Sequence, residues 1–173
     1  MTGILRALTL FIVLGTGTAS ASPVELRGVV DTERPRGCSD YSFLLWDFYR
    51  AELWSDAQQL PGDEFALALT YRSAFTRDEL VQASIDEMTR ISGRSESSLA
   101  DARREMEQGF RDVAVGDRIT ALRTSANELR FYLNGAETGT MTRDVDLFLA
   151  IWLGPKSRHK DGREALLAGR CNG

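Results

Sequence analysis

The sequence predicts an α+β fold in which helices cover one face of an antiparallel sheet. Segments with strand-like alternation come in two blocks, separated by two amphipathic helical segments, and this order lacks the repeated strand–helix–strand pattern of a parallel sheet. A later helical segment is apolar on all sides from Leu147 to Leu153, and such a helix needs a sheet to cover it. The length of 173 residues and the hydrophobic content of 43% suit one domain with one core.

The N-terminal residues have the features of a secretory signal peptide. Arg6 is the only charged residue in Met1–Ala21, and the apolar run Ala7–Leu14 is too short to span a bilayer. Ala19-Ser20-Ala21 fits a cleavage site with small residues at both ends. We expect residues 1–21 to be removed, residues 22–173 to form the mature domain, and the protein to be periplasmic or secreted without a stable membrane span. An uncleaved anchor helix is the alternative.

The charge balance argues against nucleic acid as a partner. Loss of Arg6 from the 21 Lys and Arg residues leaves 20 against 25 Asp and Glu, a net charge of −5. A protein of this sign is repelled by nucleic acids and anionic membranes. The single histidine, His159, lies on a polar loop without the partners that a zinc site or a catalytic triad needs. We expect no metal, no cofactor and a monomer.

Cys38 and Cys171 are the only cysteines in the sequence. An even count in an oxidising compartment predicts one disulfide, which would tie the first long strand to the C-terminal tail. Two free buried thiols are the alternative. The two residues are not in a CxxC motif, so a redox-active pair is not expected.

The first block of elements consists of strands. Val24–Val30 is compatible with an opening strand, and the charged segment Asp31–Gly37 with a loop. Ser39–Trp54 carries aromatic residues on both alternating faces, which predicts one long central strand covered on both sides. Pro61-Gly62-Asp63 predicts a turn, and Glu64–Arg72 the next strand.

Two helices are predicted next. Thr76 and Glu79 have the spacing of a capping box at the start of the first, and Gly93 is a typical end. The second begins near Ser95 or Ser98.

The second block combines strands with the apolar helix. Asp117–Thr124 and Asn127–Asn134 predict a strand pair, and Asn134-Gly135 predicts a tight turn into a return strand. Thr142 is the expected N-cap of the apolar helix. Gly154-Pro155 is expected to end it, with the glycine in a left-handed conformation.

Several stretches spread over nearly the whole predicted mature chain carry a family resemblance. They are Phe48–Trp54, Leu69–Arg72, the Glu79-Leu80 helix start, Val115–Asp117, Tyr132–Gly135, Gly139, Phe148, Ile151–Pro155 and Leu166–Gly169. In these stretches the chain resembles bacterial chalcone isomerase-like proteins. The resemblance implies an open-faced β-sandwich, in which a curved antiparallel sheet carries a layer of helices on one face, with a cleft between them.

The resemblance also allows the catalytic positions of plant chalcone isomerases to be located. Arg36 matches the arginine before the long strand, whereas Phe48 falls at the threonine position and Phe75 at or beside the tyrosine position. The asparagine position falls near Ala83 or Ser84. The replacing residues cannot orient water or polarise an enone oxygen, and Arg36 alone would stabilise a developing enolate weakly. We therefore expect no chalcone isomerase activity.

Arginines and aromatic residues are the candidates for ligand binding. Arginine guanidinium groups pair well with carboxylates, and strand aromatics can line an apolar pocket. The arginines could instead be solvated or could form ion pairs, such as Arg50 with Glu52 or Asp47. The aromatic residues could instead belong to the ordinary core. The candidate ligand-binding residues are Arg36, Trp46, Phe48, Arg50, Tyr71 and Arg72.

Three functions remain open from the sequence. The first is a non-catalytic protein that binds a fatty acid or another small apolar ligand between sheet and helices, by analogy with other members of the family. The second is an isomerase or lyase for an unknown enone-like substrate, with Arg36 as the catalytic candidate. The third is a protein-interaction module of the cell envelope.

Overall fold

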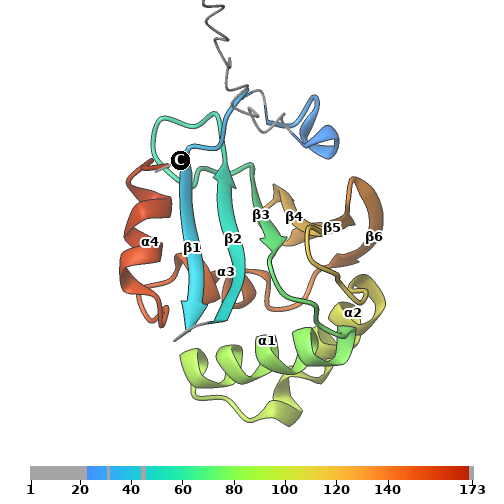
Figure 1. Ribbon diagram of the computed structural model, residues 1–173. Helices are drawn as coiled ribbons and strands as arrows, with labels where there is room; N and C mark the ends of the chain where they lie inside the picture. Colours follow the sequence, from blue (N-terminus) through green and yellow to red (C-terminus); the bar gives the residue numbers. More distant parts are fainter. Residues whose placement is uncertain (1–22, 31, 44–45, 172–173) are drawn as a thin grey trace, which may run out of the picture.

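The computed structural model describes residues 23–30, 32–43 and 46–171, and the predicted signal peptide lies outside these residues. Within them, six strands form one antiparallel sheet in which spatial order follows sequence order (Figure 1). Each strand pairs with its neighbour in the chain, including β3 and β4, which are separated by two helices. The strands are β1 (Gly37–Phe43), β2 (Trp46–Trp54), β3 (Phe65–Tyr71), β4 (Arg118–Ser125), β5 (Glu128–Leu133) and β6 (Ala136–Met141).

The helices contribute to one core on the inner face of the sheet, as the α+β prediction requires. The helices of the described chain are α1 (Arg77–Ser92), α2 (Ala100–Gly109), α3 (Val145–Leu153) and α4 (Lys160–Leu167), with a short 3₁₀ turn at Glu96–Leu99 before α2. Figure 1 shows α4 beside β1 and α2 beside β6, so helices flank both outer strands. Buried side chains from all four helices belong to the same hydrophobic cluster as Leu53, Leu67 and Phe131 of the sheet.

One long strand over Ser39–Trp54 was a wrong prediction, because the chain forms the β1–β2 hairpin there. The register pairs Phe43 with Trp46 and Tyr41 with Tyr49. No Gly, Pro, Asn or Asp stands between Phe43 and Trp46, so the sequence carries no turn signal. Aromatic residues on both faces therefore come from two paired strands.

The predicted opening strand is also wrong. Val24–Leu26 forms a 3₁₀ turn, and Gly28 has a φ of 80°, which a β-strand does not accommodate. Leu26 and Val30 instead pack against Trp54 and Leu122 on the outer face of the sheet. The buried side chain of Glu25 accepts a hydrogen bond from the Thr120 hydroxyl, so the N-terminal segment is attached to the sheet.

The local signals of the first helix and of the last hairpin are confirmed. The Thr76 hydroxyl accepts from the Glu79 amide while the Glu79 carboxylate accepts from the Thr76 amide, and Gly93 is left-handed at the other end of α1. Asn134 and Gly135 both have positive φ, at 51° and 87°, in the turn between β5 and β6.

Both predicted ends of α3 need correction. Asp144, with a φ of 54°, is the N-cap of α3, and Thr142 is held instead by Glu105 of α2, whose carboxylate accepts from the Thr142 amide and hydroxyl. Gly154 is extended, with a φ of −78°. Glycine is needed there because a Cβ would lie 2.6 Å from the Cβ of Ala150.

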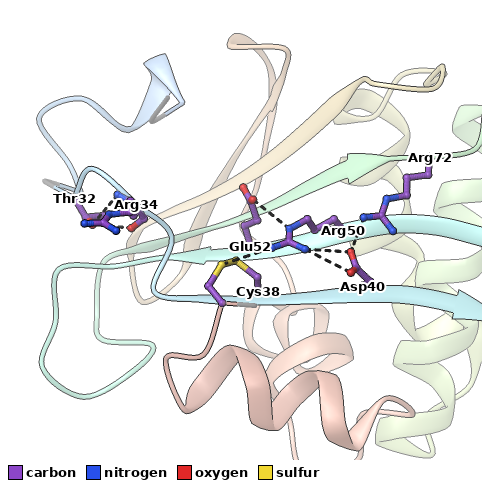
Figure 2. Close-up of a disulfide and its surroundings, with 8 residues drawn as sticks. Thr32, Arg34, Cys38, Asp40, Arg50, Glu52 and Arg72 are labelled. Atoms are coloured by element: carbon purple, nitrogen blue, oxygen red, sulfur yellow. Dashed lines mark hydrogen bonds and ion pairs between the residues drawn. A yellow bond between two sulfur atoms is a disulfide. The ribbon is translucent and has the colours of Figure 1, made fainter. Parts of the chain in front are cut away.

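The disulfide between Cys38 and Cys171 is present and fixes the C-terminal tail to β1 (Figure 2). Beside it, the Cys38 amide donates to the Arg170 carbonyl. Helix α4 approaches β1 so closely that a Cβ on Gly37 would lie 2.1 Å from the Leu166 carbonyl oxygen. Larger residues at Gly37 would therefore force α4 away from the sheet.

No helix in the described part of the chain is long and apolar enough to cross a membrane.

Candidate ligand-binding site between sheet and helices

An apolar cavity of about 140 Å³ lies between the sheet and helices α1 and α3. Its walls come from β2 to β5 on one side and from the helices and Phe110 on the other. They are formed by Tyr49, Leu67, Leu69, Tyr71, Leu80, Ala83, Ser84, Glu87, Phe110, Ile119, Ala121, Phe131, Phe148, Ile151 and Trp152. A cavity of roughly 150 Å³ lined by apolar groups stays dry and holds a benzene-sized molecule. The cavity therefore has room for part of an apolar ligand.

Two tyrosine hydroxyls at this cavity differ in their hydrogen bonding. The Tyr49 hydroxyl accepts a hydrogen bond of 3.0 Å from the indole Nε1 of Trp152, which joins β2 to α3. The Tyr71 hydroxyl makes no hydrogen bond within the described residues. Burial raises the pKa of Tyr49 to about 12 and raises that of Tyr71 as well. Both phenols are neutral at physiological pH, so Tyr71 can donate a hydrogen bond but is not a general base.

A larger, more open cleft of about 600 Å³ lies next to the cavity. It is lined by Tyr41, Ser42, Phe48, Tyr49, Glu87, Ile151, Ser157, Arg158 and His159. Tyr49, Glu87 and Ile151 line both spaces, so they form the partition between the cleft and the cavity. Ligand pockets in proteins usually measure about 300–1,000 Å³. The cleft is in this range, and the cavity alone is below it.

Glu87 of α1 is the carboxylate at this partition. Its Oε2 accepts a hydrogen bond of 2.6 Å from Arg90, and its Oε1 accepts one from Arg158. Burial opposes ionisation of Glu87, but the hydrogen bonds from Arg90 and Arg158 outweigh burial and hold the pKa of Glu87 below its ordinary value of 4.5. The carboxylate is therefore ionised and paired at neutral pH.

Among the predicted aromatic residues, Tyr71 lines the cavity and Phe48 lines the cleft. Trp46 lies in β2, and its side chain lies outside the described part of the structure. Tyr41, Tyr49 and Tyr71 form a row of ring contacts, with centroid distances of 5.0 Å and 5.7 Å between successive rings. The structure thus brings Phe48 and Tyr71 to adjoining spaces.

The predicted arginines line neither the cavity nor the cleft. Arg36 donates a hydrogen bond of 3.0 Å to the Ala57 carbonyl, close to the start of β1. Arg50 lies on the outer face of β2 and forms ion pairs with Asp40 and Glu52, and Arg72 forms a 2.8 Å ion pair with Asp40 (Figure 2). Their role in ligand binding remains a prediction, and these contacts give each of them a structural partner.

The positions aligned with plant catalytic residues are also dispersed. The rings of Phe48 and Phe75 meet edge to face at 6.0 Å, and Ser84 lines the cavity while its hydroxyl donates to the Leu80 carbonyl. Arg36 lies apart from them, at the other end of the hairpin from Phe48. The described residues thus do not gather a polar cluster around Phe48 and Phe75.

The sequence did not reveal several residues that line the cavity and the cleft. Glu87 resembled any other charge on the solvated side of α1, and Arg158 stood in a polar loop. Packing of α1 against α3 brings Glu87 beside the loop that follows α3, where Arg158 meets it. Glu87 lies three residues after Ser84 and so on the same side of the helix, but no local signal identified its partner.

The described residues contain no group of three or more His, Cys, Asp and Glu side chains placed to hold a metal ion. The cleft also has polar residues in its wall, namely Ser42, Glu87, Ser157, Arg158 and His159, whereas the walls of the cavity are mostly aromatic and aliphatic. This lining is suited to binding an apolar molecule.

The comparisons with known proteins agree with this fold. Residues 48–168 match the model of a family described as chalcone isomerase-like. A crystal structure of the fatty-acid binding protein AtFAP1 of Arabidopsis thaliana is similar in fold, with a TM-score of 0.58 and 13% sequence identity over 79% of this chain and 87% of that chain. A search of curated proteins finds no match.

The family resemblance and the predicted fold class are therefore confirmed. The family match spans β2 to α4, which includes the sheet strands and helices that enclose the cavity. The chain belongs to the chalcone isomerase-like family.

Proposed function

We propose that the protein binds a small apolar or fatty-acid-like molecule between its sheet and its helices, and that it does not isomerise chalcones. The observation that carries the proposal is the apolar cavity of about 140 Å³, which shares Tyr49, Glu87 and Ile151 with the open cleft of about 600 Å³. An apolar chain that leaves water for such a lining gains about 25 cal/mol for each Å² that it buries.

The family supports the same proposal. AtFAP1, which is similar in fold, is a fatty-acid binding protein. The absence of a polar cluster around Phe48 and Phe75 in the described structure fits a binding protein better than an isomerase, because enolate chemistry needs preorganised donors.

Ligand binding is tested by native mass spectrometry of gently purified protein and by thermal unfolding with added decanoate. A bound molecule of fatty-acid mass, or a melting temperature that rises with decanoate concentration, is expected, because a ligand of the native state stabilises it. A protein that never carries lipid and shows no thermal shift would overturn the proposal. An isomerisation assay with chalcone is expected to show no turnover above the uncatalysed rate.

We further propose that the protein is exported and acts outside the cytoplasm. The Cys38–Cys171 disulfide supports this location, since such bonds persist in oxidising compartments. The mature chain is expected to begin at Ser22, and intact mass measurement of the protein from the periplasmic or extracellular fraction checks this. A full-length mass, or retention in the cytoplasm, would contradict the proposal.

A further inference from the structure

The wall of the cleft beside the α3–α4 loop contains hydroxyl groups without partners. Ser157 and Tyr41 are 4% and 7% exposed, and neither the Ser157 Oγ nor the Tyr41 Oη has a hydrogen-bond partner among the described residues. Both residues line the cleft. The Tyr41 Oη faces α4, because a Cβ on Gly162 would lie 3.3 Å from it. Leaving a buried hydroxyl unsatisfied costs about 1–3 kcal/mol, so the Ser157 Oγ is the hydroxyl of the loop that calls for another acceptor.

The start of helix α4 lies at the same place. His159, the N-cap residue of α4, makes no side-chain capping bond, and its ring lies 4.7 Å from the ring of Tyr41. The first amide groups of a helix and its dipole favour a negative charge nearby. Asp161 is the acidic residue of this first turn, and it is exposed.

The charges at the cleft also favour an anion. Glu87 is the carboxylate that lines it, and both of its oxygens are already paired, with Arg90 and Arg158. Only the Nε of Arg158 is engaged with Glu87, and the side chain is 67% exposed. Its two terminal nitrogens are therefore free to bind a second acceptor, in the paired geometry that guanidinium groups use for carboxylates and phosphates.

We propose that the cleft binds the anionic head group of the ligand, a carboxylate or a phosphate, through Arg158 and Ser157 beside the ring of Tyr41. The chain attached to this head group passes Tyr49 and Ile151 and ends in the apolar cavity. This inference rests on the proposed function, because it assigns an orientation to the same ligand. It places the charged end at the α3–α4 loop, at the opposite end of β1 from Arg36.

The test compares three probes with one alkyl chain and different head groups, namely decanoate, decyl phosphate and decanol, by isothermal titration calorimetry. The wild-type protein is expected to bind decanoate or decyl phosphate more tightly than decanol. Arg158→Gln is expected to weaken the binding of the anions by about 10-fold or more and to leave decanol unchanged, because a charge-assisted hydrogen bond is lost. The tighter of the two anions identifies the head group.

Two further variants separate head-group binding from folding. Ser157→Ala removes a hydroxyl that has no partner in the free protein, so it is expected to weaken anion binding by about fivefold without lowering the melting temperature. Arg104→Gln, which breaks an exposed pair with Asp101 on α2, is the matched control and should change nothing.

The outcomes distinguish the two proposals. Decanol that binds as tightly as decanoate and decyl phosphate, or anion affinities that Arg158→Gln and Ser157→Ala leave unchanged, would overturn the head-group site while ligand binding stands. If none of the three probes binds, the proposed function fails and the head-group site fails with it.

Discussion

The indole Nε1 of Trp152 donates a hydrogen bond of 3.0 Å to the hydroxyl of Tyr49. The bond crosses from α3 to β2 at the partition between the cavity and the cleft. It therefore joins the helical layer to the sheet beside the apolar cavity.

Tyr49→Phe is predicted to destabilise the fold by about 1–3 kcal/mol, because it leaves the buried Trp152 donor without an acceptor. Tyr71→Phe is the matched control, since the Tyr71 hydroxyl has no partner in the described chain and its loss should be close to neutral. Urea unfolding followed by fluorescence measures both. Equal losses in the two variants would contradict the assignment of the Trp152 bond.

The disulfide is predicted to make a large contribution to stability. Cys38 and Cys171 are separated by 133 positions, and in the chain-entropy model closing a loop of this length stabilises the fold by about 5 kcal/mol. The double variant Cys38→Ser with Cys171→Ser should lose most of this in denaturant unfolding. Reductant should bring the wild-type protein to the midpoint of the variant and leave the variant unchanged. A wild-type midpoint that resists complete reduction would be evidence against this contribution.

The capping box of α1 is predicted to matter more than other helix starts. Thr76→Ala removes the hydroxyl that accepts from the Glu79 amide, and the expected cost is about 1 kcal/mol. Ser95→Ala, at the start of the 3₁₀ turn, is the control because the Ser95 side chain makes no capping bond there. Urea midpoints compare the two. If Ser95→Ala lowered the urea midpoint as much as Thr76→Ala, the capping box would add no stability beyond that of another helix start.

Glu87 is predicted to make the stability of the fold depend on pH. Its pKa in the folded protein lies below the ordinary value of 4.5, so the ionised carboxylate stabilises the fold above that pH. This contribution is lost as the pH falls through the lowered folded pKa. In melting temperatures measured against pH, Glu87→Gln should be less stable than wild type at neutral pH and equal to it in strong acid. Asp101→Asn, which breaks an exposed pair with Arg104, should follow wild type throughout. If Glu87→Gln lowered the melting temperature in strong acid as much as at neutral pH, the charge of Glu87 would not be the cause of the loss.

The sequence by itself determined the features whose physical causes are local. Thr76 and Glu79 lie three residues apart, so the capping box could be recognised without knowing the fold. Asn134-Gly135 tolerates the positive φ of the turn, and the order of alternating and helical segments determined the α+β class. Two cysteines were enough to predict one disulfide, which the structure contains.

Only the tertiary structure decided features that depend on residues far apart in the chain. The apolar segment between Phe43 and Trp46 is compatible with one strand or with two, and pairing between Tyr41 and Tyr49 selects the hairpin. Thr142 has the residue type of a helix cap. Its amide and hydroxyl instead donate to the carboxylate of Glu105, which is 37 positions away in the sequence.

The candidate site belongs to this second group. Tyr71 could be proposed from its strand, whereas Glu87 and Arg158 meet only after α1 packs beside α3. A cleft is the space that packed elements leave between them, and its charge is the sum over side chains from several elements. No window of the sequence contains that information, because the contacts that define it join distant residues, such as Tyr49 and Trp152, which are 103 positions apart.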